Sequence, residues 1–263
     1  MHTISMISAN LRYPCTSDPW PFFDQRLEAI VDLFQSRNVD IIAMQEARAD
    51  MLRALEIRLP DYVFVARARD YDEEDEAPAI AYLNRRFSLV ESETAWLSPT
   101  PEIAGSRYPG QSICPRTYQL LRLRFRGEEL SFRILNTHLD HESETARLAA
   151  AQQILARLSG LESADPKRRP LLVSGDFNAE PSEACVQAII DANSSLGLQL
   201  FDSTPQLDYS YHEYHLDPNW SPKRIDYIFH SRELQPVSFR SHEKSGSIYL
   251  SDHRFLELTF EIV

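Results

Sequence analysis

The stretch LLVSGDFNAEP, residues 171–181, reads as a buried strand that ends in polar side chains. Its first three residues form the apolar run typical of a strand inside a sheet. After a serine and a glycine come Asp176, Phe177 and Asn178. Residues two apart on a strand point to the same side, so we expect Asp176 and Asn178 to share a face while Phe177 turns into packing.

Length and composition limit the class of protein. A chain of 263 residues with 43% apolar content is long enough to bury a large core, and we expect one domain over residues 1–263. The opening MHTISMISANLRY alternates like a strand and has no leader features, and no apolar run approaches the length of a membrane span. The odd number of widely spaced cysteines predicts neither a disulfide framework nor a zinc knuckle. We therefore expect a soluble, cytoplasmic protein with no membrane partner.

The order of predicted elements indicates the architecture. A strand, an amphipathic helix at DQRLEAIVDLF, a buried strand at VDIIAMQEA, a second helix at MLRALEIRL and a third strand open the chain. Strands then dominate, including a hairpin around RGE, followed by helices at about 142–159 and about 181–195 and by further strands. The fold class is therefore α/β, with two sheets packed face to face and helices outside.

Polar side chains occur at the ends of several other strands that are otherwise apolar. In chain order they are Asn10, Glu46, His138, Asp226, Asp252 and His253. Each has an ordinary explanation alone: Asp176 or Asn178 as a helix cap, His138 as a hydrogen-bonded core residue, Asp226 as the partner of Arg224. These explanations do not account for the whole set, because burying so many polar groups without mutual pairing or a metal is costly.

The residue types in this set indicate a reaction class. Oxygen ligands without thiolates suit a hard cation such as Mg²⁺ or Mn²⁺ rather than zinc. Histidine beside carboxylates suits proton transfer, and asparagine supplies neutral hydrogen-bond donors to an oxyanion. Metal-assisted hydrolysis of a phosphate ester uses all of these groups.

At this point the sequence resembles the endonuclease/exonuclease/phosphatase superfamily. The likeness lies in six motifs in order, SANLRY, IIAMQEA, NTHLDH, SGDFNAEP, RIDYIF and SDH. Their details are most similar to small bacterial metal-dependent hydrolases related to the deadenylases. The resemblance implies a four-layer α/β sandwich of two mixed sheets between helices, with the site at one rim.

The resemblance also implies a role for each residue. Glu46 would bind the metal with Asn10 at its side, and Asp252 would complete the metal shell. His138 would contact a phosphate oxygen. Asp176 would orient or deprotonate the attacking water, and Asn178 would hold that water and the phosphoryl group. Asp226 would orient His253, which would stabilise the pentacovalent centre.

Three further positions are candidates for substrate contact by the same resemblance. Arg116 keeps a phosphate-facing charge in PRTYQLL, and Tyr118 approximately replaces an aromatic residue of the family pattern. Glu76 ends the acidic run from Asp72 to Glu76 just before the strand expected to line the cleft. That run also fits a solvated surface loop, and both interpretations stay open. His141 is interpreted as a loop residue or an indirect contact.

Charge bears on the substrate. The net charge is −12, and the only compact basic cluster is KRR at 167–169, whereas a duplex-binding protein needs a basic face. A small substrate needs only the metal and a few arginines, for which Arg116, Arg85 or Arg107 are candidates. We therefore favour a phosphodiesterase or phosphatase acting on a small phosphorylated compound. The alternative is a Mg²⁺-dependent nuclease or deadenylase-like 3′–5′ exonuclease acting on single-stranded nucleic acid. A catalytically inactive binding module fits less well, because no motif residue is missing. A structural or partner-binding protein also fits less well, because it would not need six polar strand ends that converge.

Overall fold

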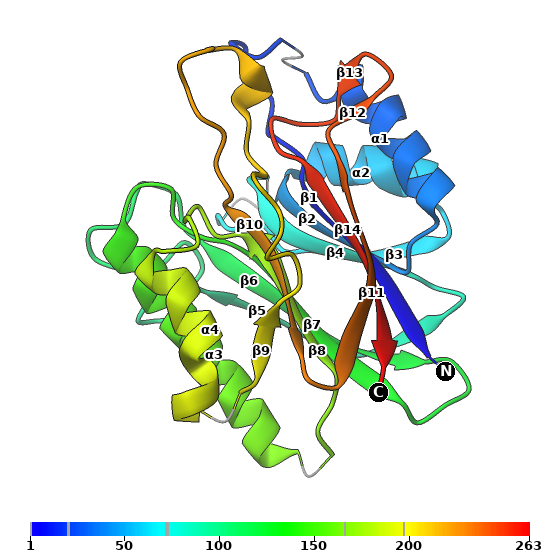
Figure 1. Ribbon diagram of the computed structural model, residues 1–263, viewed down its shortest axis with the longest axis vertical. Coiled ribbons are helices and arrows are strands. Elements are labelled where there is room, and N and C mark those ends of the chain that lie inside the picture. Colours follow the sequence, from blue (N-terminus) through cyan, green and yellow to red (C-terminus); the bar gives the residue numbers. More distant parts are fainter. Residues whose placement is uncertain (1, 20–21, 72–73, 166, 197) are drawn as a thin grey trace.

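Two six-stranded sheets form the centre of the molecule (Figure 1). The computed structural model describes residues 2–19, 22–71, 74–165, 167–196 and 198–263. The first sheet runs, in spatial order, through β11 (Leu234–His242), β14 (Phe255–Ile262), β1 (Thr3–Asn10), β2 (Ile41–Ala47), β4 (Ala77–Leu83) and β3 (Tyr62–Val65). In it β1 and β2 are parallel and the other neighbours antiparallel, so the sheet is mixed.

The second sheet is also mixed. Its spatial order is β5 (Phe87–Trp96), β6 (Thr117–Phe125), β7 (Ser131–His138), β8 (Leu171–Asp176), β10 (Asp226–Ser231) and β9 (Leu200–Asp202). Only β7 and β8 are parallel. The predicted hairpin is the pair β6–β7, with Leu121 opposite Ile134 and Leu123 opposite Phe132.

Helices cover the outer face of each sheet, which gives four layers. α1 (Asp24–Arg37) and α2 (Ala49–Arg58) cover the first sheet, and α3 (Glu144–Ala164) and α4 (Ala184–Leu196) cover the second. Three apolar clusters match the three interfaces: one between each sheet and its helices, and one between the sheets. Interior strands such as β2 and β4 are buried throughout, which explains their nearly continuous apolar sequence. The predicted four-layer α/β sandwich is confirmed. None of the described helices is both long enough and apolar enough to cross a membrane.

Short elements join those predicted from the sequence. β12 (Lys244–Ser245) and β13 (Ile248–Tyr249) form a small ribbon, and a 3₁₀ turn, η1, spans Glu213–His215. All three residues of this turn have positive φ, between 46° and 56°, in the left-handed region that side chains disfavour.

The chain direction brings the polar strand ends to one rim. β1, β2, β7 and β8 all end there, while β10 and β14 run antiparallel to their neighbours and begin there. Asp226 therefore lies opposite Asp176, and His138 lies beside it in parallel register. The rim joins both sheets, so each sheet contributes part of one polar group of residues.

Candidate active site

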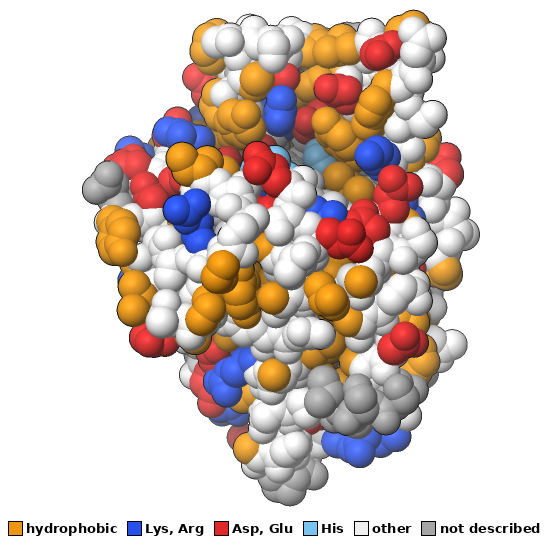
Figure 2. Space-filling view, turned by 90° about the vertical axis from the view of Figure 1, so that its left-hand side faces the viewer, with side chains coloured by type: hydrophobic (Ala, Val, Ile, Leu, Met, Phe, Trp, Pro, Cys, Tyr) orange, Lys and Arg blue, Asp and Glu red, His pale blue; other side chains and the backbone are white. Residues whose placement is uncertain are grey.

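A cavity of about 540 Å³ opens at this rim. Histidine side chains are visible at the floor of the corresponding hollow (Figure 2). Most of the residues that line it are of polar or charged types, and they are Arg12, Tyr13, Glu46, Arg48, Arg69, Asp75, Glu76, Cys114, Arg116, His138, His141, Asp176, Asn178, Tyr211, Ile225, Asp252 and His253. The predicted strand-end residues thus meet in one cavity, with Asn10 and Asp226 hydrogen-bonded directly to its lining.

Asn10 joins the two sheets at the cavity floor. Its Nδ2 donates to Glu46 Oε1 at 3.0 Å and to Asp176 Oδ2 at 2.9 Å. Asn10 is 1% exposed, and its Oδ1 accepts the backbone N–H of Arg12 at 2.9 Å. The amide therefore holds two carboxylates from different sheets close to one another.

Glu46 reaches the cavity through an irregularity in β2. The register with β4 shifts between Met44 and Ala47, and Glu46 has φ 55°. Such a bulge redirects a side chain at the end of a strand. The second oxygen of Glu46, Oε2, accepts the backbone N–H of Tyr13 at 2.8 Å. Arg12 and Asn178 are also left-handed, with φ 55° and 49°, so local backbone strain gathers around this cavity.

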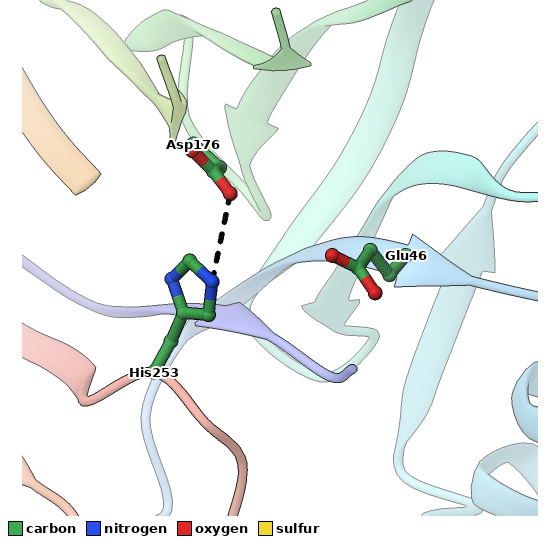
Figure 3. A group of neighbouring side chains, drawn as sticks. All are labelled: Glu46, Asp176 and His253. Atoms are coloured by element: carbon green, nitrogen blue, oxygen red, sulfur yellow. Dashed lines mark ion pairs between the residues drawn. The ribbon is translucent and has the colours of Figure 1, made fainter. Parts of the chain in front are cut away.

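Three ligand-type side chains lie together at the floor. Glu46, Asp176 and His253 each offer one atom within 4.8 Å of the others, and all three are buried (Figure 3). His253 Nε2 faces Asp176 Oδ2 at 3.8 Å, and His253 Nδ1 is hydrogen-bonded to Asp226 Oδ2 at 2.8 Å. Buried carboxylates in such a cluster fit a hard divalent cation.

The charge state of His253 is set by its acidic neighbours. Burial lowers the pKa of His253, but the charge and hydrogen bond of Asp226, together with Asp252 and Asp176, raise it to about 10. The acidic neighbours therefore favour the protonated form of His253, and Glu46 and Asp176 are the candidate acidic ligands in this group.

Asp176 has the opposite shift. Burial and the charge of Asp226 raise the pKa of Asp176 to about 7, although His253 and the backbone N–H of Asn178 oppose the rise. A carboxylate with a pKa near neutrality is suited to accept a proton from water. As predicted, Phe177 turns away and packs against Tyr227 and Phe229 on the outer face.

His138 and Asn178 form a neutral pair beside Asp176. Asn178 Nδ2 donates to Leu139 O at 3.0 Å and lies 2.9 Å from His138 Nε2. Burial, followed by the charge of Arg116, lowers the pKa of His138 well below its ordinary value. His138 is therefore neutral at physiological pH.

Charged residues from loops surround the strand-end group. Arg116 Nη2 lies 3.0 Å from His141 Nδ1, and both residues line the cavity. Arg69 forms ion pairs with Asp75 at 2.8 Å and with Glu76 at 2.7 Å. Burial, and then the charge of Glu46, raise the pKa of Glu76 to about 7. Glu76 thus belongs to the cavity wall, while Asp72 and Glu73 of the same run lie outside the described residues.

Some predicted contacts lie elsewhere. Tyr118 is buried in the cluster beneath α3 and α4, where its hydroxyl donates to Glu93, so it faces away from the cavity. Arg85 bonds Asn38, and Arg107 bonds the carbonyl of Ser112. The arginines that line the cavity with Arg116 are Arg12, Arg48 and Arg69. Arg12 and Arg48 each lie two residues after a predicted site residue, Asn10 and Glu46, whereas Arg69 had no such signal in the sequence. Arg224 forms its ion pair with Asp202 and not with Asp226, and Asp226 instead pairs with His253.

Comparison with known proteins gives a family match over most of the chain. Residues 9–253 match the model of the Endonuclease/Exonuclease/phosphatase family. None of the curated proteins matches the chain significantly.

Several solved structures have the same fold. The endonuclease/exonuclease/phosphatase from Bacteroides vulgatus is 22% identical with a TM-score of 0.90, and the match covers 100% of both chains. A mannosyl-6-phosphatase of Bacteroides thetaiotaomicron is 27% identical with a TM-score of 0.80, covering 98% of this chain and 100% of that one. D. rerio TDP2, complexed with single strand DNA product, is 17% identical with a TM-score of 0.74, covering 98% and 99%.

Proposed function

The chain belongs to the endonuclease/exonuclease/phosphatase family, and from this premise we propose that it is a divalent-metal-dependent phosphoester hydrolase acting on a small phosphorylated compound. The class is a phosphatase or phosphodiesterase. Members of this family are phosphoester hydrolases. The cytoplasmic location expected from the sequence remains part of the proposal.

The observation that carries the substrate class is the cavity. Its volume of about 540 Å³ lies in the range of small-molecule sites. Of the arginines that line it, Arg12 and Arg69 are hydrogen-bonded to carboxylates, so Arg48 and Arg116 are the candidates for binding phosphate. Arginine binds phosphate through paired N–H donors, so a few such residues suffice for one or two phosphate groups. The likeness to a mannosyl-6-phosphatase supports a phosphorylated sugar as one member of this class.

The buried acids at the floor fit a divalent cation. Glu46, with Asn10 at its side, would hold Mg²⁺ or Mn²⁺. When bound, the ion would neutralise charge on the phosphoryl oxygens and make phosphorus more electrophilic.

The remaining steps belong to residues of the chain. Asp176 takes a proton from water as the water oxygen bonds to phosphorus. The ester P–O bond breaks, and the leaving oxygen takes the bonding electron pair and then a proton from solvent to become the alcohol. His253, held protonated by Asp226, stabilises the negative charge that builds on the phosphoryl oxygens. His138 and Asn178 position the phosphoryl group, and Arg116 and Glu76 contact the rest of the substrate.

A side-by-side assay tests the substrate class. The enzyme with Mg²⁺ or Mn²⁺ is given hexose 6-phosphates, an aryl phosphomonoester, an aryl phosphodiester, and single-stranded DNA and RNA oligonucleotides. We expect the highest kcat/KM for a small ester. Degradation of oligonucleotides at a kcat/KM well above that of every small ester would instead support the nuclease or deadenylase-like alternative.

Metal removal tests the chemistry. Excess EDTA should abolish turnover, and added Mg²⁺ or Mn²⁺ should restore it. Asp176→Asn should lower kcat by about 10²-fold to 10⁴-fold, the usual contribution of a general base. Full turnover in excess EDTA would refute the proposed role of the metal.

A further inference from the structure

Arg12 lies where the acids of the cavity converge. Its guanidinium forms a two-point ion pair with Asp18, at 2.7 Å from Nε and 3.0 Å from Nη2, and Nε also lies 3.4 Å from Asp252 Oδ2. The charge of Glu46 also acts on it. Arg12 is thus a fixed cation among three carboxylates.

Asp252 is the acid that a second metal ion would need. It is buried in the cavity lining, and its charge and that of Glu46 act on one another. Its Oδ2 lies 3.4 Å from Arg12 Nε in an ion pair, and its Oδ1 accepts a hydrogen bond from the hydroxyl of Ser251 at 3.0 Å. Within the described chain, the group of His, Cys and acidic ligand atoms that lie within 4.8 Å of one another is Glu46, Asp176 and His253, without Asp252.

The position of Arg12 is built in. Its backbone N–H donates to Asn10 Oδ1, and its carbonyl accepts from Arg26 Nη2 at 2.9 Å. Arg26 is fully buried and also donates to the carbonyls of Leu11 at 2.8 Å and Leu250 at 2.6 Å. One side chain therefore ties the segment carrying Arg12 to the segment that leads into Asp252.

We infer that the site binds a single divalent cation, because the Arg12 guanidinium holds Asp252 and takes the place of a second cation beside it. Two like charges at this separation in a partly buried site repel strongly, so a second ion would have to displace Arg12 from two carboxylates. This inference rests on the proposed metal-dependent function and specifies its stoichiometry.

Mn²⁺ binding measured by electron paramagnetic resonance and by calorimetry tests it without any assay of turnover. The wild-type chain should bind one Mn²⁺. Arg12→Met, of similar length but uncharged, should gain a second Mn²⁺, and the double variant Arg12→Met/Asp252→Asn should return to one. Arg12→Lys, which keeps the positive charge, is the matched control and should stay at one.

Two single variants keep the test decisive if Arg12→Met does not fold. Glu46→Gln should lower the affinity for the first Mn²⁺ by more than about 10-fold. Asp252→Asn should change that affinity by less than about 3-fold, because the loss of a metal ligand costs far more than the loss of a more distant charge. Two Mn²⁺ in the wild type, or equal losses in these two variants, would overturn the inference alone. No Mn²⁺ binding at all would overturn the proposed function as well.

Discussion

His253 and Asp226 form one unit at the scale of single residues. We predict that Asp226→Asn and His253→Ala each lower kcat strongly, while the double variant loses little more than His253→Ala, because Asp226 acts through the 2.8 Å contact to His253. Asp226 also raises the pKa of His253, so in Asp226→Asn the loss of activity at high pH should begin at a lower pH. Steady-state kinetics over pH measure both effects.

Asp208 provides the control for this pair. It lies on the neighbouring loop, where it pairs with Arg254 at 2.9 Å and is largely exposed. Asp208→Asn should leave the pH profile unchanged. Simple additivity of the Asp226 and His253 losses would show that the two residues act separately.

His230 links stability to pH away from the cavity. Burial lowers the pKa of His230 to about 4, although Asp202 and the backbone at Phe201 oppose the shift. The folded state therefore binds this proton more weakly than the unfolded state, whose histidine pKa is about 6.5. The contribution of His230 to the free energy of unfolding is therefore fully present above pH 6.5 and is lost as the pH falls toward 4. It amounts to about 3 kcal/mol.

His230→Gln tests this linkage. Glutamine cannot titrate but can still bond the hydroxyl of Ser203, which lies 2.8 Å from His230 Nδ1. Between pH 6.5 and 4, the free energy of unfolding should fall less steeply in the variant than in the wild type. Parallel pH dependences measured by urea unfolding would contradict the prediction.

Strand periodicity predicted the strand-end residues of the site, but not the loop residues. Asn10, Glu46 and Asp176 meet because strands carry them to one rim, a relation readable from alternation and apolar runs. Arg48 and Arg69 reach the cavity from loops and a helix start, where no period relates sequence to direction. For the same reason Arg85 and Arg107 were wrong candidates for the cavity. The catalytic and ligand roles stay predictions.

At the scale of the strand, the close contact between β8 and β7 explains why a glycine, Gly175, precedes Asp176. It has φ +153°, and a Cβ there would lie 2.1 Å from the carbonyl oxygen of Thr137 on β7. We predict that Gly175→Ala lowers the free energy of unfolding by about 3 kcal/mol or more, since overpacking and backbone strain add. It should also lower kcat, because the separation of β7 and β8 sets His138 against Asp176. Urea unfolding and kinetics measure the two losses.

Gly160 is the matched control. It lies in α3 with open space around the position of a Cβ. Gly160→Ala should raise the free energy of unfolding by about 0.5–1 kcal/mol, because alanine loses less entropy in a helix. Similar effects of the two substitutions would show that the contact with Thr137 does not matter.

The regular elements were predictable because they are long and periodic. The helices expected at about 142–159 and 181–195 are Glu144–Ala164 and Ala184–Leu196. β9, β12 and β13 have only two or three residues, too few to display a period. The turn Glu213–His215 was also missed, because three consecutive left-handed residues without glycine contradict local preference and depend on tertiary contacts.

At the scale of the whole molecule, Asn136 fastens the two sheets together next to the site. Its Nδ2 donates to the carbonyls of Met44 at 2.8 Å and Ala79 at 2.9 Å, and its Oδ1 accepts from Gln45 Nε2 at 2.7 Å. We predict that Asn136→Leu lowers the free energy of unfolding by about 3 kcal/mol or more, because several buried polar groups lose their partners. Mn²⁺ affinity should fall too, since Glu46 follows the bonded segment of β2.

Ile134→Val on the same strand is the control. Ile134 belongs to the cluster between the sheets. Removing one methylene there should lower the free energy of unfolding by about 0.5–1.5 kcal/mol and leave the Mn²⁺ affinity unchanged. Chemical unfolding and calorimetric titration compare the variants. Equal Mn²⁺ affinities in the two would show that Asn136 does not hold the site. The prediction of a single domain over residues 1–263 remains a prediction at this scale.

The pairing of β1 with β14 also determines when, during synthesis of the chain, the first sheet can be completed. β1 lies between β2 and β14, so one of its edges can pair as soon as β2 has been synthesised, and the other can pair only after β14 has been synthesised. At a synthesis rate of about 5–20 residues per second, that edge stays open for roughly ten to fifty seconds on the ribosome. His253 directly precedes β14, so the residue that completes the polar rim arrives with the strand that closes the sheet. During translation the nascent chain therefore has neither a closed first sheet nor the complete polar rim, and its open strand edge is a surface open to pairing with other chains.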